Sequence, residues 1–306
     1  MGVKYRRPMK IKRSLTALVA ACIAYIYAAV YWTQSNQAGE YLSLTLYKPF
    51  VYRQLIPMLA RALTWLGVSA NMAIVLVMAG AGVGFYFALR ALIFEFYHDA
   101  GRLDLWALLL FILGLSLFWF ERLPSDWMTG CLFALAFLFL AQSRLAAYML
   151  LYPIVCFNRE TAFLLTVFYL VWMLRKTRRD LWRDGLIFCY QVLIWFAVRI
   201  GLMLVFARNG GLNAWIYPLQ NMLKFFQHPW HSLLHIGIFA GLLLLVFKGW
   251  KRKPLFLRLA FLTLAPLLLI MYWILGQPWE VRVLWEVYPV TAVLLLPAGN
   301  FKVADY

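Results

Sequence analysis

The stretch PWEVRVLWEVYP, residues 278–289, places three charged side chains at the mouth of a long apolar run. A formal charge beside the membrane interior is costly unless it is paired or solvated. Arg282 and Glu286 are four residues apart, so they are expected to share one helix face, and Pro278 suits a first helical turn. Taken alone, this stretch predicts a salt-bridged start of a membrane helix.

The composition around this stretch is that of a helical membrane protein. Of the 306 residues, 65% are hydrophobic and only 13% are charged, and the mean hydropathy is +0.76. A soluble domain of this size carries about a quarter charged residues. Apolar runs near 20 residues recur along the chain, which predicts a polytopic, all-α membrane protein with one transmembrane domain over residues 1–306. About ten spans are expected, at 14–32, 69–92, 105–120, 127–142, 145–158, 161–175, 185–207, 232–248, 258–276 and 281–298.

The basic residues predict the orientation of the chain. With the N-terminus inside, 20 of the 29 lysines and arginines fall in inner segments, as the positive-inside rule requires. The net charge of +17 is therefore a topology signal, and we expect no nucleic-acid partner. The basic start runs directly into an apolar span too long for a cleavable signal, so a retained signal anchor is expected. Both termini are predicted to be cytoplasmic.

Two long outer segments, the first and fourth outer loops, are each expected to carry a helix lying at the membrane interface. In the first, residues 33–68, the amphipathic stretch 54–66 has Arg61 on its polar side and Trp65 near its end. The second, residues 208–231, contains aromatic residues that are typical of the interface. The other outer junctions are short. All six outer acids lie in these loops and junctions, mostly within a few residues of a span end, a pattern that suggests a lined cavity.

The junction ERLPSD, residues 121–126, has two interpretations. Ser125 is a natural N-cap, and Asp126 would then sit in the positive first turn of the fourth span. Alternatively, Asp126 is an acid beside the cavity, available as a base or metal ligand. Glu121 and Arg122 belong to the same junction.

The junction NRET, residues 158–161, contains an arginine that helix capping does not explain. Asn158 is expected to cap the sixth span, and Glu160 is favoured by the helix dipole. Arg159 needs an acid partner, an anionic ligand or a path to the headgroups. Arg53 has the same character, with lipid phosphate or a phosphate-bearing substrate as its alternatives.

Other candidate ligands carry less weight. The four cysteines lie in apolar spans without metal-ligand spacing, so they are expected to be buried thiols. His228, His231 and His235 share one helical face, but no carboxylate partner is evident, so ordinary interfacial histidines are preferred over a metal site. No metal site is therefore assigned, although a divalent metal stays open. Arg199 lies within the seventh span, either snorkelling or paired inside the bundle.

The chain resembles the GT-C type of polytopic membrane glycosyltransferase. The resemblance rests on a signal anchor, a long first outer loop with an acid, and a juxtamembrane helix after KPFVYRQLIP, residues 48–57. The SDWMTG, FNRET and EVRVLWEVYP junctions are similar to those of bacterial membrane proteins in this group. Members often carry a pair of acids in the first loop, and here Glu40 stands alone.

The resemblance implies sugar transfer from a polyprenyl-phosphate donor at the outer face of the bacterial inner membrane. Glu40 is the first choice as catalytic base and Asp126 the second. Arg53, Arg159 and Arg282 would hold the departing lipid phosphate. The remaining junction residues implied as substrate-binding are Glu121, Arg122, Asn158, Glu160, Glu280 and Glu286.

Two other classes of function stay open. A transporter or flippase for an anionic lipid or sugar phosphate would also need arginines in a membrane cavity, together with charges reaching the midplane. A non-catalytic membrane subunit would pack its aromatic flanks against a partner protein. In every class, membrane lipid is an expected partner.

Overall fold

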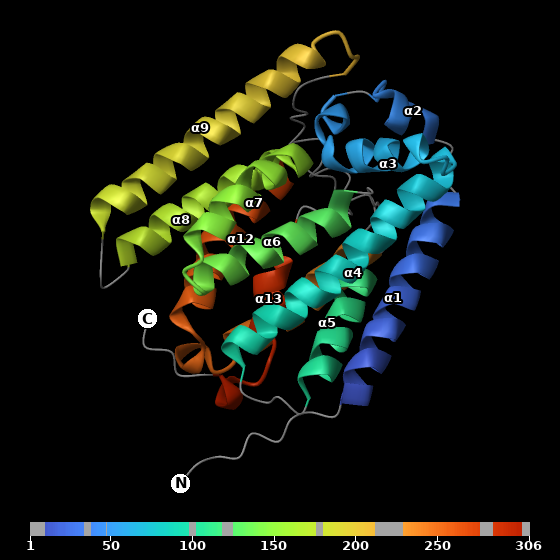
Figure 1. Cartoon of the computed structure of the whole chain (residues 1–306). Coiled ribbons are helices and arrows are strands. Elements are labelled where there is room, and N and C mark those ends of the chain that lie inside the picture. The colour runs from blue at the N-terminus through green and yellow to red at the C-terminus, as the bar shows by residue number, and fades with distance from the viewer. Residues whose placement is uncertain are drawn as a thin grey trace.

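The computed structural model describes residues 10–33, 38–46, 48–97, 102–117, 125–175, 180–211, 229–275 and 284–301, and these residues form helices joined by turns (Figure 1). The α-helices are α1 (Lys10–Thr33), α2 (Ala38–Ser43), α3 (Leu55–Trp65), α4 (Ala70–Phe96), α5 (Leu103–Leu117), α6 (Ser125–Ala141), α7 (Leu145–Asn158), α8 (Phe163–Arg175), α9 (Leu181–Val205), α11 (Pro229–Phe247), α12 (Leu255–Leu275) and α13 (Tyr288–Leu294). Short 3-10 helices are η1 (Phe50–Tyr52), η2 (Glu160–Ala162), η3 (Trp250–Arg252) and η5 (Ala298–Asn300). The prediction of an all-α chain is confirmed.

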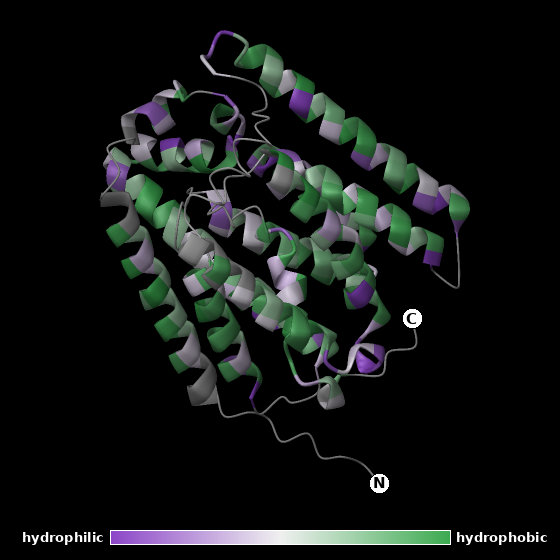
Figure 2. Ribbon diagram, turned by 180° about the vertical axis from the view of Figure 1, so that it is seen from behind, coloured by the Kyte–Doolittle hydropathy of each residue, from purple (hydrophilic) through white to green (hydrophobic). Residues whose placement is uncertain are grey.

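Some of the described helices have the length and composition of membrane helices. Among the described residues, three helical segments are long and apolar enough to cross a membrane: Ala70–Phe96, Leu181–Val205 and Leu255–Tyr272. Hydrophobic residues predominate along the ribbon (Figure 2). Large apolar side chains face outward, with Trp65 86% exposed, while Asp126 is 2% exposed. A surface with this many large apolar side chains is unlike that of a typical water-soluble protein and fits lipid contact.

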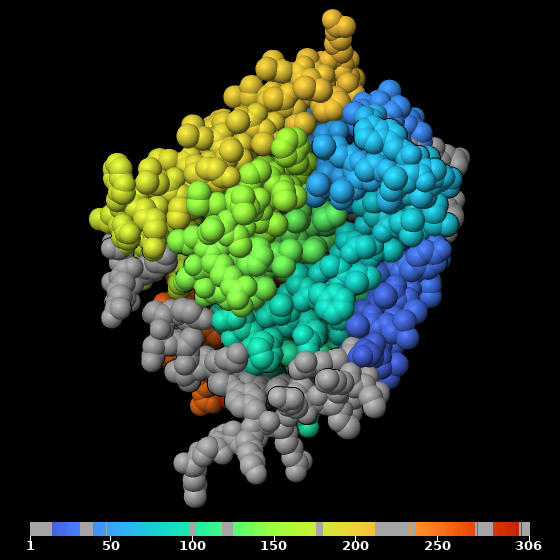
Figure 3. Space-filling view, in the orientation of Figure 1, coloured from blue at the N-terminus to red at the C-terminus, as the bar shows by residue number. Residues whose placement is uncertain are grey.

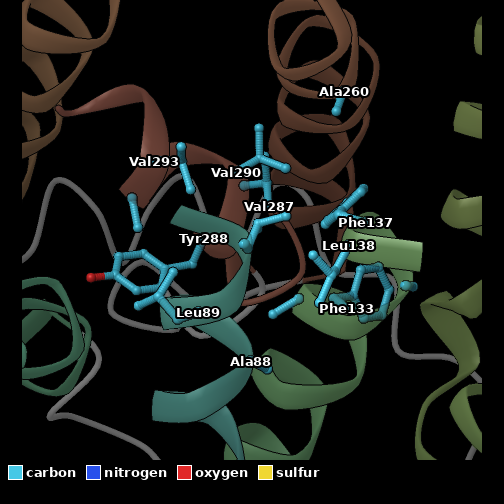
Figure 4. Close-up of a cluster of buried hydrophobic side chains, with 14 of the residues drawn as sticks. Ala88, Leu89, Phe133, Phe137, Leu138, Ala260, Val287, Tyr288, Val290 and Val293 are labelled. Carbon is cyan, nitrogen blue, oxygen red and sulfur yellow. The ribbon is translucent and has the colours of Figure 1, made fainter. Parts of the chain in front are cut away.

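The core forms where α4 and α6 pack closely together. A Cβ added to Gly82 of α4 would lie 2.5 Å from the ring of Trp127, so only glycine permits this approach. Figure 4 shows part of the core, a cluster of buried side chains to which Leu89 of α4, Phe133 of α6 and Val290 of α13 belong. Interlocked aromatic and branched side chains thus fix the position of α6, which carries Asp126 at its start.

The last apolar segment folds differently from the sequence-based expectation. Within the described residues, α13 covers Tyr288–Leu294, and Glu286 lies in the preceding turn rather than on a helix face. Proline in the first turn of α13 has no amide hydrogen, so it suits the start of a helix and not its interior. Arg282, its expected partner on the same face, lies outside the described residues.

The path of the chain brings several junctions between helices to one end of the molecule. Helix α6 begins, α7 ends and α8 begins at this end, and η1 and α3 lie beside them (Figure 1). The amide of Gln54, just before α3, donates to the carbonyl of Phe157 at the end of α7 at 3.0 Å. This backbone bond fastens the first loop directly to the α7–α8 junction.

Candidate functional site

Arg159 lies at the centre of a buried charge cluster. Its Nη1 is 3.1 Å from Oδ1 of Asp126, and its Nε is 3.1 Å from Oε1 of Glu286. The three side chains are at most 3% exposed. The acid partner that a cation at a helix start requires is therefore supplied twice, from α6 and from the turn before α13.

Glu286 is also held by a hydroxyl. Thr161 of η2 donates to Oε1 of Glu286 at 2.5 Å, although the two residues are 125 positions apart in the chain. Oε2 of Glu286 is buried and has no hydrogen-bond partner among the described residues. A buried carboxylate with one oxygen left over retains capacity to accept a further donor.

Arg53 and Glu160 form the second ion pair of the cluster. Nη2 of Arg53 donates to Oε1 of Glu160 at 3.0 Å, and the two side chains are 8% and 25% exposed. Nε and Nη1 of Arg53 are buried without a hydrogen-bond partner in the described part of the chain. The ring of Phe50 lies 5.3 Å from the guanidinium carbon. Arg53 thus pairs with one acid and has two donors without a partner among the described residues, whereas the charge of Arg159 is paired with two acids.

Electrostatics keep this pair ionised. Burial opposes the charge on Glu160, but Arg53, with a contribution from Arg159, outweighs burial and lowers the pKa of Glu160 to about 2. Burial likewise disfavours the Arg53 cation, yet Glu160 raises the pKa of Arg53 above its ordinary value. Both groups are therefore charged across the physiological pH range.

Asn158, at the end of α7, holds the α7–α8 junction in place through a hydrogen bond to α6. Its Nδ2 donates to Oγ1 of Thr129 at 2.8 Å, and Thr129 donates in turn to the carbonyl of Ser125 at 2.9 Å. The prediction that Asn158 caps the following helix is wrong, because Asn158 is the last residue of α7 and its amide reaches across to α6. Its role is to tie α6 and α7 together beside Asp126.

A layer of aromatic rings lies next to the charge cluster. Trp127 and Trp285 directly neighbour Asp126 and Glu286 in the chain, and their ring centroids are 6.5 Å apart. Phe85 and Phe111 pack against these rings with centroid distances of 5.5 and 5.3 Å. All four rings are at most 2% exposed. The cluster therefore borders a dense apolar layer, which raises the strength of its ion pairs by excluding water.

The structure brings together six of the predicted site residues and leaves one apart. Arg53, Asp126, Asn158, Arg159, Glu160 and Glu286 belong to the cluster and its support. Glu40 is exposed in the first turn of α2. Its neighbour Tyr41 is buried. Glu121, Arg122, Glu280 and Arg282 lie outside the described residues.

Three contributors were not anticipated from the sequence. Thr161 binds Glu286, Trp195 of α9 donates to the carbonyl of Glu160 at 2.9 Å, and Thr129 receives Asn158. Threonine and tryptophan are common in apolar helices, so their types alone gave no signal. Trp195 lies four residues before Arg199, and that spacing on one helix face was the available hint.

Among the described residues, no group of three histidine, cysteine or acidic residues is placed to hold a metal ion. His228 and the side chains of His231 and His235 fall outside that description. Cys131 and Cys156 are buried as expected, whereas Cys22 and Cys189 are exposed on the apolar surface.

Comparison with known proteins gave no relative. No family model, no curated protein and no solved structure matches the chain.

Proposed function

We propose that the protein is a membrane glycosyltransferase that moves a sugar from a polyprenyl-phosphate donor to an acceptor hydroxyl at the outer face of the bacterial inner membrane. The observation that supports this proposal most is the meeting of outer junctions at one buried cluster with two arginines. Anionic leaving groups are stabilised by fixed cations in a site that excludes water. The proposal includes about ten membrane spans and two interfacial helices. Helix α3, Leu55–Trp65, coincides with the stretch 54–66 that the sequence predicts as the first interfacial helix.

Arg53 is the proposed contact for the donor phosphate. Its Nε and Nη1 have no hydrogen-bond partner among the described residues, and Glu160 holds the guanidinium in place through Nη2. Guanidinium binds phosphate oxygens through two parallel donors. Arg159 is engaged by Asp126 and Glu286, so its proposed part is to position the junction.

Glu40 is the proposed general base. It is exposed on α2, which precedes the segment of the first loop that carries Arg53. Its carboxylate would take the proton of the acceptor hydroxyl while the acceptor oxygen bonds to the sugar carbon. The bond from that carbon to the phosphate oxygen breaks, and polyprenyl phosphate leaves with its negative charge beside Arg53. Asp126 is bound to Arg159 and is the weaker candidate for this role.

The test uses the full chain, purified in detergent, with a polyprenyl-phosphate sugar and an acceptor extract from the same cells. We expect Glu40→Gln to lower transfer by about 10²–10⁴-fold, the usual contribution of a positioned base. Arg53→Gln should also abolish most transfer. Arg208→Gln, an exposed arginine just after α9, is the matched control and should leave transfer unchanged. Unchanged transfer in both Glu40→Gln and Arg53→Gln, with normal thermal unfolding, would refute the proposal.

Transport of an anionic lipid or sugar phosphate is the second candidate. Asp184 and Gln191 of α9 are fully buried, and they accept hydrogen bonds from Tyr169 and Tyr148. These polar groups continue from the site toward the other end of the helices, as a transport path would require. The aromatic layer beside the charge cluster opposes such a path. Substrate uptake by proteoliposomes without any transfer product would favour transport.

A further inference from the structure

Arg199 of α9 is a cation without an acid partner in the described part of the chain. No described acid lies within salt-bridge distance, and its guanidinium carbon is 4.4 Å from the centroid of the Tyr52 ring. The sequence left two choices for Arg199, snorkelling or pairing inside the bundle. In the structure the guanidinium lies over the aromatic face of Tyr52, in the first loop. A cation–π contact orients a guanidinium but does not neutralise its charge.

Two sets of contacts link Arg199 and its helix to the segment that carries Arg53. One helical turn earlier, Trp195 donates to the carbonyl of Glu160, whose carboxylate binds Nη2 of Arg53. On the other side, Tyr52 directly precedes Arg53 in the chain. The two arginines therefore flank the same short segment, and Arg53 retains two buried donors without partners among the described residues.

The end of α9 is fastened to the first loop at this place. The amide of Lys48 donates to the carbonyl of Gly210 at 2.8 Å, and Nδ2 of Asn209 donates to the carbonyls of Leu44 and Leu46 at 2.8 and 2.9 Å. In the space-filling view the orange end of α9 lies against the blue first-loop segment (Figure 3). These bonds fix Arg199 relative to Tyr52.

Along the rest of its length α9 presents an apolar surface. Leu193, Leu204 and Val205 are 69, 72 and 73% exposed. In a membrane this surface contacts acyl chains, so a lipid tail lying on α9 places its phosphate near the helix end. Arg199 lies six residues before that end.

We propose that Arg199 and Arg53 together bind the phosphate group of a membrane lipid whose tail lies along α9. The inference rests on the proposed function, in which Arg53 holds a lipid phosphate, and it adds Arg199 and the α9 side as the place of that lipid. Two arginines, one of which has two donors without a partner among the described residues, favour a doubly charged phosphate monoester over a phosphodiester headgroup, because the monoester offers more oxygens and more charge.

The test is direct binding to the full chain in neutral detergent, measured by native mass spectrometry with a polyprenyl monophosphate as the probe. We expect Arg199→Gln to weaken binding about tenfold, which corresponds to about 1.4 kcal/mol. Arg199→Lys, which keeps the charge and loses the planar fork, should fall between Arg199→Gln and the unaltered protein. Arg208→Gln is the control and should bind normally. Polyprenol, phosphatidylglycerol and inorganic phosphate are the comparison ligands.

The outcomes separate the source of the phosphate and the two proposals. Stronger binding of polyprenyl monophosphate than of the other three, lost with Arg199→Gln, supports the inference. Equal binding of inorganic phosphate or phosphatidylglycerol overturns the lipid monoester, and binding unaffected by Arg199→Gln overturns the site. Binding that depends on Arg199 without any sugar transfer would keep this inference and reject the transferase. Transfer that requires Glu40 but not Arg199 would do the reverse.

Discussion

At the scale of single residues, the cluster around Arg159 decides how the site behaves. Two carboxylates and two arginines are buried together in the described part of the molecule, and a third carboxylate, that of Glu160, is 25% exposed beside them. Removing one member of a buried pair leaves the other as an uncompensated charge in an apolar surrounding, which costs more than the pair itself contributes. The cluster is therefore sensitive to substitution even where a residue takes no part in chemistry.

Arg159→Gln should lower the free energy of unfolding by about 3–5 kcal/mol, because Asp126 and Glu286 would lose their cation. The measurement is thermal unfolding of the protein in detergent. The control is Arg183→Gln, whose ion pair with Asp180 is more than half exposed and should cost less than about 1 kcal/mol. Equal loss in the two variants would contradict the buried role of Arg159.

The ion pair of Arg53 and Glu160 should make stability depend on pH in the acid range. The pKa of Glu160 is lowered from 4.5 to about 2, so between these values the unfolded chain binds a proton that the folded chain does not. The pair's contribution is therefore complete above pH 4.5 and is lost as the pH falls toward 2. Unfolding temperatures from pH 7 to 3 should fall less steeply in Glu160→Gln than in the exposed control Asp180→Asn. Parallel curves for the two variants would show that Glu160 is not held by Arg53.

At the scale of elements, close packing of α4 against α6 and α1 holds the start of α6 in position. The ring of Trp127 packs directly against Gly82 of α4 and leaves no room for a side chain there. Trp127 is the residue that follows Asp126 in the chain. The packing of these helices therefore helps to fix the position of Asp126 in the charge cluster.

Gly82→Ala should destabilise the protein by about 1–3 kcal/mol, the usual cost of overpacking a filled core. The added Cβ would lie 2.5 Å from Trp127 and 3.0 Å from the Cβ of Ala24 in α1. Gly80→Ala on the same helix meets nothing within 4 Å and should be neutral or stabilising by up to about 1 kcal/mol. Thermal unfolding of the two variants separates packing from helix propensity, and equal stability would contradict the close approach.

A similar distinction appears in the basic segment between α11 and α12. The sequence has a run of lysines and arginines between residues 248 and 258, which is expected to determine the membrane topology. In the structure Lys253 is buried and donates to the carbonyls of Leu245, Val246 and Leu294, whereas Lys251 and Arg252 are exposed. One cation of the run thus binds the carbonyl ends of α11 and α13, and its neighbours face outward.

At the scale of the whole molecule, the bias of basic residues toward the inner segments predicts an orientation in the membrane. In a background where the four free cysteines are replaced by serine, Thr45→Cys should react with an impermeant maleimide on intact cells. Arg144→Cys, in the turn between α6 and α7, should react only after the membrane is opened. Labelling of Arg144→Cys on intact cells would reverse the predicted topology and remove the site from the outer face.

Hydropathy and charge bias act along the chain, so they were enough to predict a helical, apolar protein and to locate most helices closely. The sequence also singled out Arg53 and Arg159 as cations that need partners. The partners themselves, Asp126 and Glu286 for Arg159 and Glu160 for Arg53, became known from the folded arrangement of the helices. These pairs join residues up to 127 positions apart, between Arg159 and Glu286, and depend on how glycines and aromatic rings let the helices approach. Spacing within one segment carries no information about that approach, which is why Thr161, Trp195 and the resting place of Arg199 emerged only in three dimensions.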